Sequence, residues 1–336
     1  MLRQAQHERY WSNETVNAPV QVYLRSYLAP LDPWLERDDV TDLLVNRAGE
    51  LWIETSGGGS ERAAVPALTE QMLQRLARQI AGASAQGVNR EQPLLSASLP
   101  DGARVQIVAP PATRHGLALA IRKHVISDLS VGELAETGLF APPPSTSDDE
   151  ALDALLAAGD GAGFLTLAVK QRKTIILSGG TSSGKTTLLN ALVKEMPPHE
   201  RLIAIEDAPE IRLVHPNSLG LIAVRGEGGE ARVDAEDLLQ ATLRMRPDRI
   251  LLGEIRGKEA FAFLRAVNTG HPGSITTVHA DSPKGAIDQI AMMALLGGLD
   301  IGWDAIRAYV RSVVDIIVQL RHDRGKRSIV AIERFR

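Results

Sequence analysis

The chain contains no cysteine, which excludes disulfide bonds and thiolate zinc sites and is compatible with a reducing compartment. It also has no apolar run approaching the roughly 20 residues that a membrane-spanning helix needs. The first residues lack the apolar stretch of a signal peptide. We therefore expect a cytoplasmic protein.

Aromatic residues make up only 4% of the chain and the net charge is −4. No stretch interleaves aromatic with basic residues, as a channel that tracks a nucleic-acid strand would. These features disfavour a nucleic-acid motor and a polybasic membrane surface, although they leave room for a local patch. A length of 336 residues, 44% of them apolar, exceeds what one hydrophobic core usually supports and predicts two domains.

One glycine-rich stretch, residues 179–187 (GGTSSGKTT), matches the G-x-x-x-x-G-K-[ST] pattern of a phosphate-binding loop. An apolar run precedes it and helical spacing follows it, which is the strand–loop–helix setting that such a loop requires. In this setting Lys185 reaches the β- and γ-phosphates of a nucleoside triphosphate, and the Thr186 hydroxyl is placed to hold Mg²⁺. The predicted nucleotide-binding residues are Gly180, Thr181, Ser182, Ser183, Gly184, Lys185, Thr186 and Thr187.

The pattern of the chain changes twice. Residues 1–126 combine helices with short strands and a hairpin around an Asp-Gly pair, which predicts an N-terminal α+β domain with a small antiparallel sheet. Residues 127–161 contain three consecutive prolines and a Ser/Thr/Asp run, typical of an exposed linker. Over 162–336 short apolar strands alternate with helices, which predicts an α/β domain with a mostly parallel sheet covered on both faces.

Carboxylates follow two of the predicted strands of the second domain. Ligands bind off the carboxyl ends of parallel strands, so we expect Glu206, Asp207 and Glu254 to face the same crevice as Lys185. Hydrolysis needs an oriented or deprotonated water, and Glu254 is the predicted catalytic base. Glu206 is placed nearest the metal or its waters. For Glu254 the alternative is a surface glutamate at a turn. For the group Glu206, Asp207 and Glu210 it is a solvated helix-capping cluster.

Two histidines, His271 and His279, flank another predicted strand. They lack a third partner at a recognisable spacing, so we do not predict a zinc site. Either histidine alone is more often a buried, hydrogen-bonded residue than a functional one. Near a γ-phosphate, however, His279 could donate a hydrogen bond and report phosphate loss to its strand, and both interpretations stay open.

Arginines form the last group of candidates. Arg104 and Arg122 lie in otherwise apolar strands of the first domain, where a charge is costly without a partner such as a phosphate. An outward-facing position is the preferred interpretation on these residues alone. Any of four further arginines could act as a finger from a neighbouring subunit, and the sequence does not choose between them: Arg244, Arg246, Arg249 and Arg256.

Four stretches in order resemble the Walker A, Asp box, Walker B and His box of the secretion ATPase superfamily: 179–187, 205–210 (IEDAPE), 251–256 (LLGEIR) and 269–280 (TGHPGSITTVHA). The chain is most similar to the VirB-type traffic ATPases of bacterial type IV secretion, which drive substrate export and pilus assembly. The resemblance covers nearly the whole chain. It implies a RecA-like P-loop NTPase domain with a smaller N-terminal α+β domain, a homo-hexameric ring and Mg²⁺-dependent ATP hydrolysis.

The same resemblance implies partners and further site residues. Arg104 and Arg122 match the N-terminal arginines that reach the nucleotide's phosphates in that family. The implied partners are inner-membrane components of a secretion machine, with a peripheral position at the inner face of the bacterial inner membrane and no sequence-specific nucleic-acid binding. A linker of this length lets the N-terminal domain serve its own ATPase domain or a neighbour's, and we favour exchange between neighbours.

Departures from the family pattern bear on the alternatives. Ser182 stands where many relatives have glycine, which a loop tolerates if that residue is not left-handed. The chain lacks the four-cysteine zinc insertion of type II secretion ATPases, which disfavours that branch. Pilus assembly or retraction motors share all four motifs and are the nearest alternative, followed by a RecA-like nucleic-acid motor and a docking ring that turns over little nucleotide.

Overall fold

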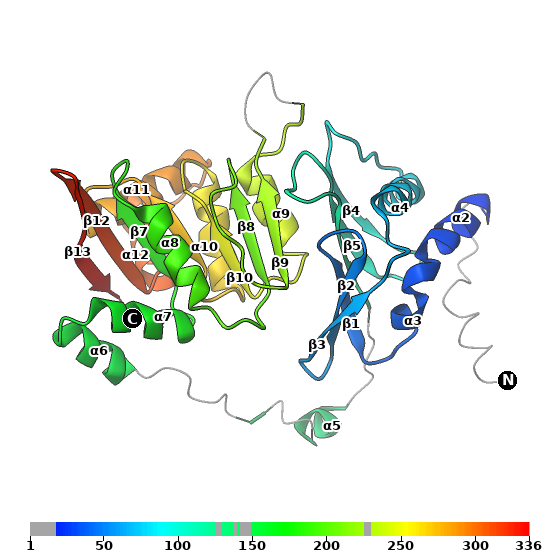
Figure 1. Cartoon of the computed structure of the whole chain (residues 1–336), viewed down its shortest axis with the longest axis horizontal. Coiled ribbons are helices and arrows are strands. Elements are labelled where there is room, and N and C mark those ends of the chain that lie inside the picture. The colour runs from blue at the N-terminus through cyan, green and yellow to red at the C-terminus, as the bar shows by residue number, and fades with distance from the viewer. Residues whose placement is uncertain (1–17, 125–129, 137–139, 142–148, 225–229, 336) are drawn as a thin grey trace.

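The structure is a computed structural model that describes residues 18–124, 130–136, 140–141, 149–224 and 230–335. It consists of an N-terminal and a C-terminal domain, each built on its own sheet (Figure 1). Within these described ranges, no helix combines the length and the apolarity that a membrane span requires.

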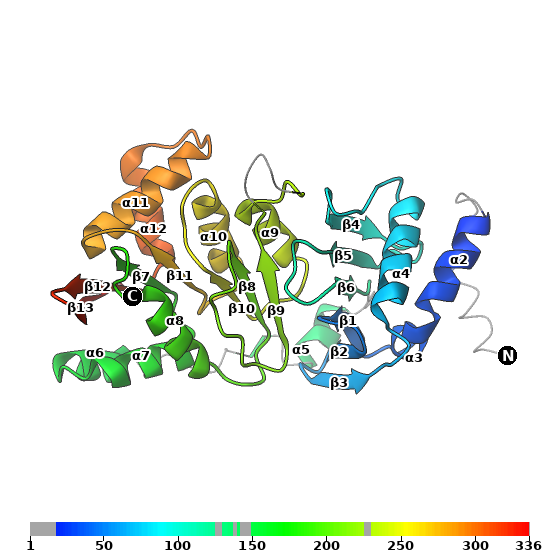
Figure 2. The same cartoon turned by 45° about the horizontal axis from the view of Figure 1, so that its top comes forward.

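The N-terminal domain is a six-stranded antiparallel sheet with helices packed on it, as the sequence predicted (Figure 2). Its strand order is β3–β2–β1–β6–β5–β4. The strands are β1 (Val40–Val45), β2 (Glu50–Thr55), β3 (Ser60–Ala64), β4 (Leu94–Ser98), β5 (Arg104–Val108) and β6 (Ala118–Arg122). The helices are α2 (Ala18–Leu28), α3 (Asp32–Leu35), which follows the short 3-10 turn Ala29–Leu31, and α4 (Glu70–Ala83).

Helix α4 shows how the sequence determines this packing. The Thr69 hydroxyl caps its start by accepting a hydrogen bond from the Met72 N–H at 3.2 Å. Apolar residues recur at spacings of three and four and are buried in the domain core, namely Leu73, Leu76, Ala77 and Ile80. Because polar residues occupy the other positions, the helix has a single face that can cover the sheet.

The C-terminal domain has a seven-stranded sheet in the order β13–β12–β7–β11–β10–β8–β9. All neighbours pair in parallel except β12 and β13. The strands are β7 (Ile175–Gly179), β8 (Leu202–Glu206), β9 (Ser218–Ile222), β10 (Arg249–Leu252), β11 (Ile275–Val278), β12 (Ile316–Asp323) and β13 (Lys326–Arg334). The expected mostly parallel sheet is therefore confirmed.

Helices cover both faces of this second sheet. One core lies under α6 (Asp149–Ala157), α7 (Gly161–Lys170) and α8 (Lys185–Lys194). The other lies under α9 (Ala235–Thr242), α10 (Glu259–Asn268), α11 (Pro283–Leu296) and α12 (Trp303–Val313). The strands between the two layers are almost completely buried, which explains their continuous apolar runs.

In its described part, the segment 127–161, for which we expect a linker, contains helices α5 (Val131–Glu136) and α6 and the first residue of α7. Helix α5 has no buried residue, whereas Leu152 of α6 is fully buried in the core beneath α7. The end of this segment therefore contributes to the C-terminal domain. The proline-rich residues 142–148 lie outside the described residues.

The two domains of one chain are joined at the β9 edge of the second sheet. Thr113, in the loop between β5 and β6, bridges to Leu221 of β9. Nearby, the Asn46 amide donates to Asn217 Oδ1 at 3.0 Å. Buried apolar residues of both domains form one cluster, including Leu44 and Val108 from the N-terminal sheet. The N-terminal domain is therefore docked on its own C-terminal domain through backbone, polar and apolar contacts.

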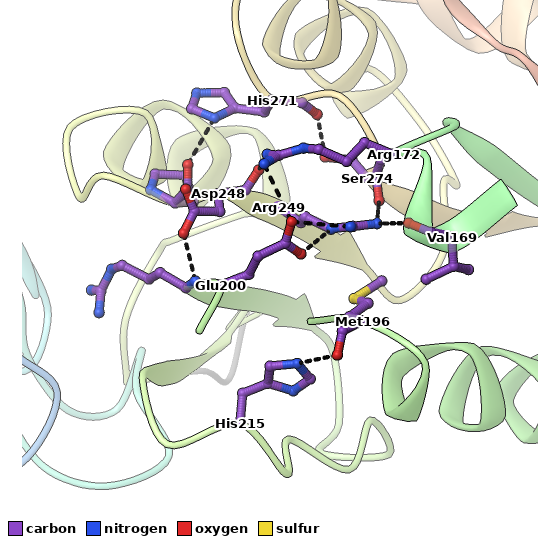
Figure 3. Close-up of polar contacts among 12 residues, drawn as sticks. Val169, Arg172, Met196, Glu200, His215, Asp248, Arg249, His271 and Ser274 are labelled. Carbon is purple, nitrogen blue, oxygen red and sulfur yellow. Dashed lines mark hydrogen bonds and ion pairs between the residues drawn. The ribbon is translucent and has the colours of Figure 1, made fainter. Parts of the chain in front are cut away.

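A buried network of charges lies at the amino ends of the parallel strands (Figure 3). The Arg249 side chain is 0% exposed and pairs with Glu200, with an Nη2–Oε1 distance of 3.1 Å. Its Nη1 also donates to the Val169 carbonyl at 2.8 Å, and Arg172 pairs with the same glutamate at 3.2 Å. Arg249, one of the four expected finger candidates, is therefore inaccessible to a neighbouring subunit.

This network gives a prediction about stability. Arg249→Met should lower the free energy of unfolding by about 3–5 kcal/mol, because it leaves the Glu200 carboxylate buried without its main partner. Urea denaturation followed by circular dichroism measures the change. Arg244→Met, at an exposed arginine of the same segment, is the matched control and should change stability by less than about 0.5 kcal/mol. Equal effects of the two substitutions would contradict the assignment.

Candidate functional site

A pocket of about 500 Å³ lies beside the phosphate loop, at the carboxyl ends of the parallel strands. It is lined by the whole run from Thr181 to Thr187, by Glu206 after β8, by Glu254 after β10 and by His279 after β11. The structure thus brings together the residues that the sequence placed in one crevice. Parallel strands achieve this because their carboxyl ends all meet at the same edge of the sheet.

The phosphate loop takes its shape from glycines and from Lys185. Gly184 has a φ of +99° and is the residue before α8, so the chain enters the helix through a left-handed turn. The Lys185 Nζ donates to the carbonyls of Gly179 at 2.7 Å and Gly180 at 3.1 Å. Burial lowers the pKa of Lys185, and the nearby Glu254 partly opposes that shift.

Ser182 does not meet the condition under which a loop tolerates serine in place of glycine, namely a backbone that is not left-handed. Its φ is +62°, so it does adopt the left-handed conformation that glycine accepts more readily. The strain, of order 1 kcal/mol, persists only where the surroundings hold the residue in place. The Arg327 Nε contributes to this by donating to the Ser182 carbonyl at 3.1 Å.

Arg327 is a pocket residue that the sequence analysis missed. It lies on β13, in the last hairpin of the chain, and lines the pocket together with the phosphate loop. It arrives there because β12, its hairpin partner, pairs with β7 directly beside the loop. No local motif marks this arginine, so only the strand order could have revealed it.

Glu254 is held between two partners at the pocket. Its Oε1 lies 2.9 Å from His279 Nε2 and its Oε2 accepts a hydrogen bond from Arg256 Nη2 at 2.8 Å. Arg256 also pairs with Asp207 at 2.8 Å, and the carboxylates raise the pKa of this arginine. With a side chain 17% exposed, Glu254 is not a solvated surface residue and can present a fixed carboxylate to a bound water.

The two candidate histidines have different environments. His279 is about half exposed and contacts Glu254 at the pocket. His271 lies at the opposite end of β11, where its Nδ1 is 3.0 Å from the Pro247 carbonyl, and burial lowers its pKa (Figure 3). The interpretation as a buried structural histidine therefore fits His271 and not His279.

Glu206 lies in the pocket wall but its carboxylate is already engaged. Its Oε1 accepts the backbone N–H groups of Glu210 at 2.9 Å and Ile211 at 2.7 Å, and its Oε2 pairs with Arg114. The carboxylate that contacts the Thr186 hydroxyl is that of Glu210, at 3.2 Å. The expectation that Glu206 lies nearest the metal or its waters stays a prediction, and Glu210, from the same group of carboxylates after β8, is a second carboxylate beside Thr186.

Arg104 and Arg122 do not line this pocket. They are register partners on β5 and β6, are exposed, and line a separate cavity of about 470 Å³ together with Arg244. Among the described residues that line this cavity, none is acidic. Within one chain, the outward-facing interpretation of these two arginines is therefore correct.

The other three arginines considered as arginine fingers have different partners in the structure. Arg246 pairs with Asp248 at 3.0 Å and approaches Glu54 at 3.6 Å, so it supports the domain junction. Arg256 holds Glu254 inside the chain's own pocket. Arg244 remains the candidate that is exposed and that lies beside Arg104.

Comparison with known proteins identifies the family. Residues 26–323 match the type II/IV secretion system protein family. The chain is 37% identical over 340 residues to the type IV secretion system protein VirB11 of Bartonella quintana, covering 96% of this chain and 94% of the relative. It is 42% identical over 308 residues to the PtlH homolog of Bordetella bronchiseptica, covering 89% and 91%.

A solved structure supports the same assignment. The crystal structure of the VirB11 ATPase from the Brucella suis type IV secretion system, in complex with sulphate, aligns with a TM-score of 0.87 and 37% identity. The alignment covers 94% of this chain and 95% of that one. The chain therefore belongs to the type II/IV secretion system protein family, with the RecA-like domain and smaller N-terminal α+β domain that its motifs implied.

Proposed function

We propose that this protein powers a bacterial type IV secretion machine by hydrolysing ATP in the pocket between the phosphate loop and Glu254. Family membership makes the chain a P-loop ATPase. The observation that carries the proposal is the convergence of Lys185, Glu254 and His279 on one pocket of nucleotide size. The named relatives are type IV secretion proteins, which favours secretion over a pilus retraction motor.

The contacts around the pocket indicate which step of ATP hydrolysis each residue supports. Lys185 exchanges the carbonyls of Gly179 and Gly180 for phosphate oxygens when the nucleotide binds. Glu254 orients the attacking water, while Arg256 and His279 fix its carboxylate. His279 also lines the pocket, and we propose that it donates a hydrogen bond to the γ-phosphate.

The residues beside Thr186 fit a magnesium ion. A hydroxyl and the Glu210 carboxylate, 3.2 Å apart, are hard oxygen donors of the kind that Mg²⁺ prefers. When bound, the ion supplies positive charge that neutralises the β- and γ-phosphate oxygens. We therefore propose Thr186, supported by Glu210, as the place where the protein holds Mg²⁺.

The proposal extends to assembly. We propose a homo-hexamer at the cytoplasmic face of the inner membrane, in contact with inner-membrane components of the machine. The position of Arg104 and Arg122 supports a ring, because these arginines lie in a separate cavity from their own phosphate loop. To reach phosphates they must serve the pocket of a neighbouring subunit, and turnover then requires assembly.

The central test of the proposal removes the phosphate-loop cation. Lys185→Ala should abolish ATP binding and turnover while leaving the fold intact, because the substitution removes the charge that contacts the phosphates and two hydrogen bonds within the loop but no core contact. Fluorescent-nucleotide binding and phosphate release measure the two effects. Lys194→Ala, at the exposed end of the same helix, is the matched control and should behave as wild type. Unchanged hydrolysis in the Lys185 variant would refute the site.

A second prediction concerns the catalytic base. Glu254→Gln should bind Mg·ATP normally but hydrolyse it at least about a hundredfold more slowly, because the amide cannot accept the proton from water. Single-turnover kinetics separate the chemical step from nucleotide binding. The exposed Glu195→Gln serves as the control. Comparable rates for Glu254→Gln and wild type would transfer the role to Glu210 or Glu206.

The third prediction tests whether sites are shared between subunits. Rings mixed from Arg104→Ala/Arg122→Ala subunits and Lys185→Ala subunits should regain activity. Some of their sites combine an intact Lys185 with intact arginines from the adjacent chain. Differently tagged subunits verify the mixing, and each variant alone gives the baseline. No recovery in verified mixed rings would count against sharing, because sites within one chain still lack one element each.

A further inference from the structure

The N-terminal domain extends one cation, Arg114, to Glu206, a residue that lines the nucleotide pocket. This residue lies in the loop between β5 and β6, and its backbone N–H donates to the Gly220 carbonyl of β9 at 3.0 Å. Its side chain, 12% exposed, continues inward to pair with the Glu206 carboxylate, which is 3% exposed. The Nη1 donates to the Ile211 carbonyl at 2.9 Å. The guanidinium thus crosses the domain junction to reach a pocket-lining residue.

These contacts secure both ends of one short loop, residues 206–211. At one end Arg114 pairs with Glu206, and at the other it binds the Ile211 carbonyl. Glu206 itself accepts two backbone N–H groups from the far end of the loop, those of Glu210 and Ile211. The carboxylate and the guanidinium therefore close the loop into a compact, hydrogen-bonded turn.

The same loop presents two side chains to the reaction site. Glu210 contacts the Thr186 hydroxyl at 3.2 Å, and Asp207 pairs with Arg256, which in turn holds Glu254. A shift of the loop would therefore disturb both the proposed magnesium ligands and the proposed base. Displacements of about 1 Å at such positions can slow an enzyme by about a hundredfold.

Domain docking does not by itself require this ion pair. The strand bridge to β9, the Asn46–Asn217 hydrogen bond and the shared apolar cluster already join the domains. A second pair across the junction, Arg90–Glu230, lies on the surface, with side chains 62% and 51% exposed. Burial lowers the pKa of Arg114. The Glu206 carboxylate paired with it supplies the opposite charge that a buried cation needs.

We propose that Arg114 is a positioning residue for ATP hydrolysis. By fixing residues 206–211 it makes the geometry at Thr186 and Glu254 depend on the docked N-terminal domain of the same chain. This proposal rests on the proposed function, since it assumes that the pocket hydrolyses ATP. It assigns the N-terminal domain a direct structural influence on the chemistry, separate from any phosphate contact made by Arg104 or Arg122.

Gly220 provides an independent way to displace the arginine. A Cβ built on this glycine would lie 2.8 Å from Arg114 Cγ and 2.5 Å from its Nε, so a side chain there forces the guanidinium away. Gly220→Ala therefore removes the same contact without altering Arg114 itself. In a strand, alanine is otherwise at least as favourable as glycine.

The experiment compares four variants of the full-length assembled protein, measuring kcat, the KM for ATP and the Mg²⁺ concentration for half-maximal turnover. Arg114→Gln and Gly220→Ala should both lower kcat about tenfold or more and raise the Mg²⁺ requirement, with KM for ATP within about twofold of wild type. Arg114→Lys, which keeps the charge, should recover part of kcat. Arg90→Gln, at the exposed junction pair, should behave as wild type.

Two results would overturn the proposal. One is wild-type or increased kcat with an unchanged Mg²⁺ requirement in either folded variant. The other is a reduction of kcat in the double variant Arg114→Gln/Glu206→Gln that equals the two single reductions combined. A residue that acts through Glu206 should lower kcat little further once that carboxylate is gone. If Arg114→Gln fails to fold, Gly220→Ala decides alone. Loss of activity in Lys185→Ala alongside a normal Arg114→Gln would reject this inference and leave the proposed function standing.

Discussion

The parallel pairing of β7, β11, β10 and β8 is the constraint on which the site depends. Their register aligns Ser178 with Val278 and Leu252 with Ile205, so the residues that follow these strands emerge at one edge. Each strand is nearly or fully buried between two helical layers, and a one-step slip would move Glu254 or His279 to the wrong position. The hydrophobic core therefore determines the catalytic geometry.

The amino ends of the parallel strands, at the opposite edge of the sheet, hold buried cations that are compensated by nearby oxygens. Here Arg201 is completely buried, with its Nη1 donating to Asn46 of the N-terminal domain at 2.7 Å and its Nε to the Met245 carbonyl at 2.9 Å. Burial lowers the pKa of Arg201 to about 10. Neutral oxygens and nearby carboxylates keep this cation in the interior, where it joins the domains. The buried cations Arg201 and Arg249 thus stabilise the amino edge of the sheet, while the carboxyl edge presents both the Lys185 cation and the Glu254 carboxylate to the pocket.

Much of this arrangement could be predicted because its signals are local. The phosphate loop, the carboxylates after β8 and β10 and the alternation of strands with helices are all visible within short windows. The contacts that were missed depend on pairing between distant segments. Arg327 reaches the pocket only because β12 lies beside β7, and Arg114 reaches Glu206 only through the bridge to β9. The left-handed Ser182 is a backbone property that residue type alone does not determine.

The N-terminal domain contributes cations in two directions. Arg114 pairs with Glu206 in the pocket wall of its own chain, whereas Arg104 and Arg122 face a separate cavity. Under the proposed ring assembly, each site would then depend on N-terminal domains from two subunits, one positioning a loop and the other supplying charge. Movement of one N-terminal domain would alter its own proposed magnesium site and the phosphate contacts proposed for its neighbour together. Coupling between two sites requires an element whose position affects both of them. In the proposed ring, the N-terminal domain is that element, because ligand binding at either site shifts its position.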